Sequence, residues 1–167
     1  MTTSMHQASI PTITRALTNL IGVLEKGAAH AEAKKIDPSV LLASRLYPDM
    51  FSLSKQVQVA TDIAKGGMSR LAQVEAPKYE DNEATFADLI ARIRKTIAYL
   101  ESLKPAQIDG SETRTITWTA MGNEYSMPGQ QYLFNRIFPN VFFHCATAYN
   151  ILRHNGLEIG KLDFLGR

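Results

Sequence analysis

Residues 82–103 read NEATFADLIARIRKTIAYLESL, and their pattern guides the interpretation of the whole chain. The apolar side chains recur at steps of three and four, which places them on one face of a helix. They are Phe86, Leu89, Ile90, Ile93, Ile97 and Leu100. Four charged residues fall largely off this stripe: Arg92, Arg94, Lys95 and Glu101. The segment is therefore predicted to be an amphipathic helix with one buried face.

Three other segments carry the same apolar spacing, over residues 10–24, 53–71 and 133–151. The first is expected to start near Ser9 and Pro11, because proline is tolerated in the first turn of a helix. Prolines mark the connections between the stripes. The sequence thus predicts one all-α domain over residues 1–167, a four-helix bundle whose long helices pack antiparallel.

Residues 113–127 change to an alternating pattern, in which Ile116 and Trp118 are separated by threonines. This period of two is typical of a strand. Gly122 and Asn123 tolerate the positive φ of a tight turn. A small β-hairpin is therefore expected between the third and fourth long helices.

Two features of the helices bear on packing. Pro139 falls inside the fourth stripe, which predicts a kink about one turn before Asn140, because proline lacks a backbone N–H and clashes with the preceding turn. The second stripe is rich in alanine and glycine, including Gly66 and Gly67. Such a face either lets a neighbouring helix approach closely or leaves a cavity.

The composition excludes several classes of protein. Eighteen basic and sixteen acidic residues give a net charge of +2 with no basic cluster, so nucleic acid is not an expected partner. No apolar run is long enough for a membrane span or a signal peptide. A single cysteine, Cys145, allows no internal disulfide. A cytoplasmic protein is expected.

The candidate functional residues are His144, Asn140 and Gln56. His144 lies on the apolar stripe of the last helix, with Asn140 four residues earlier on the same face. An inward histidine needs a hydrogen-bond partner or a metal ion, so His144 is either a satisfied core residue or a ligand-binding or catalytic one. Gln56 borders the second stripe and is interpreted as facing either an interior pocket or the surface. Gln58 and Asp62 are expected at a solvated edge, and Cys145 in the core.

Three stretches of the chain resemble a known family. They are residues 45–66 (RLYPDMFSLSKQVQVATDIAKG), 138–156 (FPNVFFHCATAYNILRHNG) and 160–166 (GKLDFLG). They are similar to an uncharacterised bacterial family, domain of unknown function 1993, of the DinB/YfiT-like superfamily. The resemblance implies a bundle related to metal-dependent enzymes, among them thiol transferases and maleylpyruvate isomerases that use low-molecular-weight thiols.

The resemblance also implies a divalent metal such as zinc or nickel, held by one histidine of the second helix and an HxxxH pair of the fourth. Here the pair reads Asn140-x-x-x-His144, and the second helix offers Gln56 or Gln58 instead of histidine. Amide oxygens are weak ligands for these metals. The expected site is therefore an altered metal site, with His144 as its one candidate metal ligand.

Two classes of function remain open on the sequence. One is a metal- or thiol-dependent transferase or isomerase with His144 as ligand or general base, in a pocket that Asn140 and Gln56 help to line. The other is a non-catalytic bundle that binds a small molecule or another subunit. Extra aromatic residues around the last helix, such as Phe134 and Phe143, favour a homodimer.

Overall fold

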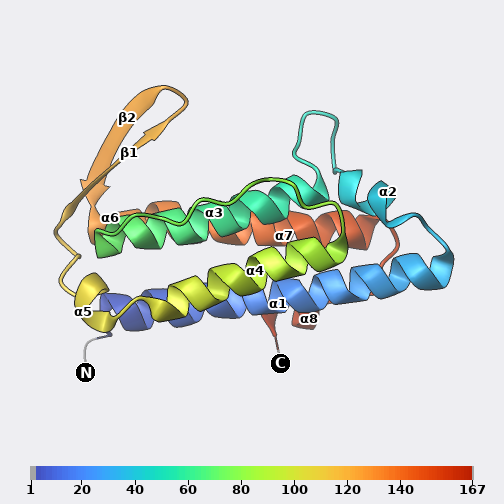
Figure 1. The fold of residues 1–167 in the computed structure, drawn as a ribbon, viewed down its shortest axis with the longest axis horizontal. Helices are drawn as coiled ribbons and strands as arrows, with labels where there is room; N and C mark the ends of the chain where they lie inside the picture. The colour runs from blue at the N-terminus through green and yellow to red at the C-terminus, as the bar shows by residue number, and fades with distance from the viewer. Residues whose placement is uncertain (1–2, 167) are drawn as a thin grey trace.

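The structure is a computed structural model that describes residues 3–166. Its long helices are α1 (Met5–Lys34), α3 (Leu53–Ala72), α4 (Phe86–Ser102) and α7 (Phe138–His154). Figure 1 shows them side by side. Both α1 and α3 contact both α4 and α7, and the apolar stripes meet between them. The prediction of a mostly helical chain with a small hairpin is confirmed.

Shorter elements complete the chain. They are α2 (Pro38–Ala43), α5 (Pro105–Ile108), α6 (Gly129–Tyr132) and α8 (Lys161–Leu165). The C-terminal α8 packs against α1. None of the helices in the described part of the chain is long and apolar enough to cross a membrane.

The start of α1 differs from the prediction. The helix begins at Met5. There the Ser4 hydroxyl accepts a hydrogen bond from the backbone N–H of Gln7, and the side-chain oxygen of Gln7 accepts one from the backbone N–H of Ser4. This reciprocal cap starts the helix one and a half turns before Pro11, which consequently lies inside it. The start expected near Ser9 and Pro11 is wrong, because the Ser4–Gln7 cap begins the helix earlier.

The long helices are not all antiparallel. Gln58 bonds to Glu83 and Ser69 to Tyr99, so α3 and the segment leading through α4 advance in the same direction. The connection over residues 73–85 runs back along the helices before α4 begins (Figure 1). It is long enough, because thirteen extended residues reach up to about 43 Å and the 20 residues of α3 span about 30 Å. The antiparallel prediction is wrong for this pair.

The hairpin consists of β1 (Thr115–Ala120) and β2 (Asn123–Pro128), which pair antiparallel with Trp118 opposite Tyr125. Its turn residues are Met121 and Gly122, with φ of 50° and 77°. The turn therefore lies one residue earlier than predicted. Trp118 stacks on Tyr125 and also contacts Tyr132 of α6, which holds the hairpin against the helices.

The irregularity predicted near Pro139 is a π-helical turn, η1 (Leu133–Ile137), directly before α7. The Phe138 amide donates to the Leu133 carbonyl, so the turn takes up one extra residue ahead of the proline ring. Ile137 of this turn lies against Gly67 of α3, where an added Cβ would come within 2.7 Å of the isoleucine side chain. Gly67 on the second stripe thus allows η1 to approach α3 closely at this point.

Candidate functional site

His144 and Gln56 form a buried polar pair between α7 and α3. The Nδ1 atom of His144 lies 2.6 Å from Oε1 of Gln56. Nε2 of Gln56 donates to the backbone oxygen of Phe51 at 3.2 Å. The two side chains are only 8% and 1% exposed, respectively. The structure thus brings together two of the three residues that the sequence singles out, and it adds the Phe51 carbonyl as an anchor.

The Phe51 carbonyl fixes the hydrogen-bonding roles in this pair. A carbonyl only accepts hydrogen bonds, so Gln56 turns its nitrogen to Phe51 and its oxygen to His144. Nδ1 of His144 must then carry the hydrogen that the amide oxygen accepts. Burial lowers the pKa of His144 below its ordinary value, which favours the neutral ring. The pair therefore presents an imidazole whose Nε2 keeps its lone pair.

Asn140 does not join this pair. It is half-buried, and its Nδ2 donates to the backbone oxygen of Arg136 at 2.6 Å. The expectation that Asn140 points into the interior beside His144 is corrected accordingly, because its amide group is directed along its own helix.

Cys145 lies in the core, as predicted. It is 1% exposed, and burial raises the pKa of its thiol to about 12. A thiol with this pKa is protonated at neutral pH, and the thiolate is the nucleophile in cysteine chemistry. Cys145 is therefore unsuited to nucleophilic catalysis.

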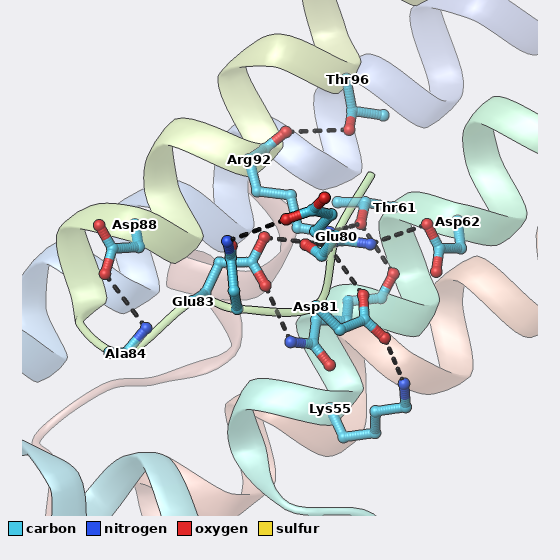
Figure 2. A network of polar contacts seen from close by, with 12 residues as sticks. Lys55, Thr61, Asp62, Glu80, Asp81, Glu83, Ala84, Asp88, Arg92 and Thr96 are labelled. Carbon is cyan, nitrogen blue, oxygen red and sulfur yellow. Dashed lines mark hydrogen bonds and ion pairs between the residues drawn. The ribbon is translucent and has the colours of Figure 1, made fainter. Parts of the chain in front are cut away.

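A second buried polar cluster surrounds Arg92 of α4 (Figure 2). The Arg92 guanidinium lies 2.8 Å from Asp62, 3.0 Å from Asp81 and 2.9 Å from Glu83, and its Nε donates to Thr61. Burial lowers the pKa of Arg92, but the hydrogen bond that Arg92 donates to Glu83 and the three negative charges outweigh burial and raise the pKa overall. The group stays charged and fully paired.

Two sequence expectations fail at this cluster. Arg92 was expected largely off the buried face, yet its side chain is 2% exposed. Gln58 was expected at a solvated edge with Asp62, but Gln58 is buried and donates to Glu83 at 2.8 Å. Asp62 is partly exposed and also pairs with Lys65. Arg92 bonds to the carboxylates of Asp81 and Glu83, and Gln58 bonds to that of Glu83, so both side chains are held in the interior.

The acidic stretch over residues 80–83, EDNE, is the signal that could have predicted this cluster. It belongs to the connection between α3 and α4 and runs alongside both helices (Figure 1). Arg92 binds it by the backbone oxygen of Glu80 as well as by the two carboxylates. Arg92 thereby fastens the long connection to the helices.

Comparison with known proteins places the chain in a family. The family described as "Domain of unknown function (DUF1993)" matches residues 5–165. The chain belongs to the DUF1993 family. This DUF1993 chain is also similar to a DinB family member protein from Shewanella denitrificans, known from a crystal structure, with 41% identity and a TM-score of 0.87. The match covers 97% of this chain and 92% of that one. No curated protein matches.

The DUF1993 chain does not supply the histidine triad that its resemblance to metal-binding DinB relatives implies. Within residues 3–166, no group of three or more histidine, cysteine, aspartate or glutamate side chains could hold a metal ion. Nδ1 of His144 is already bonded to an amide oxygen. One imidazole and one amide make a poor zinc or nickel site. The residues present do not fit the metal.

Proposed function

We propose that this DinB-like DUF1993 protein binds a small molecule at His144 without a metal ion. The observation that carries the proposal is the chain of hydrogen bonds from the Phe51 carbonyl through Gln56 to Nδ1 of His144. It orients the ring and leaves Nε2 as an acceptor, and His144 as a residue is 8% exposed. A hydroxyl or thiol group is the natural partner for such an acceptor.

A second candidate function is thiol-dependent transfer or isomerisation at the same residue. The free Nε2 lone pair supports it, because an unprotonated imidazole nitrogen can accept a proton at neutral pH. In that step the proton of a bound low-molecular-weight thiol moves from sulfur to Nε2, which leaves a thiolate. In this second candidate function, the site that the sequence predicts as an altered metal site works without a metal ion, and His144 alone accepts the proton.

The test uses glutathione as the thiol probe and S-methylglutathione, which lacks the S–H group, as its matched control. The imidazole nitrogens of His144 are observed by NMR in isotopically labelled protein. Glutathione is expected to shift the Nε2 signal saturably, and S-methylglutathione is not. An equal response to both compounds, or no response, would contradict a site that accepts a hydrogen from a thiol.

Calorimetric titration with Zn²⁺ and Ni²⁺ tests the metal-free part of the proposal. We expect no stoichiometric binding by the parent chain. Stoichiometric binding that is lost in His144→Ala would overturn this part and favour the metalloenzyme expectation. The variant His154→Ala, with an exposed histidine on the same helix, serves as control.

We also propose that α1, α3, α4 and α7 are the four helices of a DinB-type bundle, and that the protein is a cytoplasmic homodimer. Contacts among the four helices support the first part. Phe134, Phe142 and Phe143 are 47%, 37% and 56% exposed around the last helix, which supports the dimer. Light scattering that shows a monomer at tens of micromolar would contradict the dimer.

A further inference from the structure

A pocket of about 220 Å³ lies between α3, β1 and the α6–η1 segment, away from His144. Arg136, which lines the pocket, is separated from His144 by about 12 Å along the helix at 1.5 Å per residue. A pocket of this size suits a compact organic molecule.

Two guanidinium groups line this pocket without acidic partners. Among residues 3–166, neither Arg70 nor Arg136 has a carboxylate within salt-bridge distance, whereas Arg92 has three. Arg70 makes one long hydrogen bond of 3.4 Å to the hydroxyl of Tyr132. Arg136 lies over the ring of Trp118 at 5.4 Å. Both cations are thus held in place but not neutralised.

Asp62, the one acidic residue that lines the pocket, already pairs with two cations. Asp62 accepts from Arg92 at 2.8 Å and from Lys65 at 2.7 Å, and both of these bonds involve its Oδ1 atom. The two cations offset its charge. The pocket as a whole therefore carries a positive potential, which attracts anions.

The indole nitrogen of Trp118 is an independent indication of a missing acceptor. Trp118 lines the pocket and is only 8% exposed, yet its Nε1 is buried without a hydrogen-bond partner in the described part of the chain. A buried donor without an acceptor costs about 1–3 kcal/mol. Buried indole N–H groups usually have a partner, and the described residues supply none for Trp118.

We propose that this pocket binds a small carboxylic acid as its carboxylate. The planar fork of an arginine matches the two oxygens of a carboxylate, and Arg70 and Arg136 both face the pocket as unpaired cations. Ile63, which is partly exposed, supplies apolar surface for a short hydrocarbon body. The inference is independent of the proposed function at His144.

The chain contains a single tryptophan, so its one indole N–H signal in an NMR spectrum reports on this pocket. Butyrate is the probe, and butyramide is its neutral control of the same shape. Ionic strength is held constant with sodium chloride because surface electrostatics are screened by salt. We expect butyrate to move the indole signal saturably, with butyramide at least tenfold weaker.

Variants separate the pocket from non-specific charge effects. Arg70→Gln and Arg136→Gln are each expected to weaken butyrate binding at least tenfold, while Arg94→Gln, at an arginine 65% exposed and outside the pocket, leaves it unchanged. His144→Ala also leaves it unchanged, which keeps this test distinct from that of the proposed function. No saturable shift, equal binding of butyramide, or binding of inorganic phosphate in preference to butyrate would each overturn the proposal.

Discussion

Arg92 of α4 and His144 of α7 are both buried polar residues that bond to side chains of α3, but they differ in how many partners the chain provides. Arg92 has three carboxylates, a threonine hydroxyl and a backbone carbonyl around it. His144 has one hydrogen bond, from Nδ1 to Gln56. A fully paired charge has no capacity left for a ligand and is structural. An imidazole with an unused nitrogen has that capacity, which is why the proposed binding site is placed at His144.

The largest effect is expected from Arg92→Ala. Removal of this guanidinium leaves Glu83, whose side chain is 9% exposed, without its cation and releases the connection over residues 73–85. Breaking a buried ion pair from one side costs about 3–5 kcal/mol. Chemical denaturation measures the free energy of unfolding. The control Arg94→Ala, at an exposed arginine, should change the free energy of unfolding by no more than about 0.5 kcal/mol. Equal losses of stability in both variants would contradict a structural role for Arg92.

The next largest effect is expected from Gln56→Ala, which leaves the Nδ1 hydrogen of His144 without an acceptor. The cost of a buried unpaired donor is about 1–3 kcal/mol. Gln131→Ala, at an exposed glutamine of α6, is the matched control. If Gln56→Ala unfolds at the same denaturant concentration as the parent, the hydrogen bond that orients His144 contributes nothing.

The pH dependence distinguishes the two clusters further. Burial lowers the folded-state pKa of His144, so the unfolded chain binds a proton more readily than the folded one. Stability should therefore fall as the pH drops below about 6.5, by at most about 1.4 kcal/mol per pH unit for this one group. Above pH 7 this contribution should be constant.

Denaturation at pH 5–8 checks this slope. His144→Gln should lose it, and His154→Gln, at an exposed site, should keep it. Asp81 titrates in a separate pH range. The hydrogen bond from Lys55 lowers the pKa of Asp81, so the contribution of Asp81 to stability is lost only as the pH falls below about 3.9. An unchanged slope in His144→Gln would show that another group titrates.

The smallest effect is expected from Lys55→Ala at the rim of the Arg92 cluster. Lys55 pairs with Asp81 at 2.6 Å, but the two side chains are 40% and 36% exposed. Exposed ion pairs contribute about 0–1 kcal/mol and weaken with salt. Thermal unfolding at low and high salt measures the difference. A loss as large as that of Arg92→Ala would show that the rim, and not Arg92, holds the connection.

The helices, the hairpin and the burial of His144 could be predicted from the sequence. The spacing of Leu89, Ile93 and Leu100 identifies a helix and its buried face, and the position of His144 on a stripe correctly predicts burial beside α3. These inferences succeed because apolar periodicity is a local property. The alternation around Trp118 likewise identifies the hairpin.

The remainder depends on contacts that are distant in the sequence. Arg92 is drawn inward by carboxylates of a connection whose path is not a local property, and that path also makes α3 and α4 parallel. The Asn140 side chain bonds to the backbone of the preceding π-helical turn, at Arg136, instead of to a neighbouring helix. The pocket at Arg70 requires the hairpin to fold back onto α3.

The protonation state of the His144 ring decides whether Nε2 can accept a hydrogen bond, and NMR of the imidazole nitrogens measures that state. We predict a neutral ring at pH 7 with the hydrogen on Nδ1 and a pKa below 6.5. Gln56→Glu, which places a carboxylate against Nδ1, should raise that pKa. A parent ring with its hydrogen on Nε2, or with a pKa above 6.5, would contradict the assignment of an unused acceptor at His144.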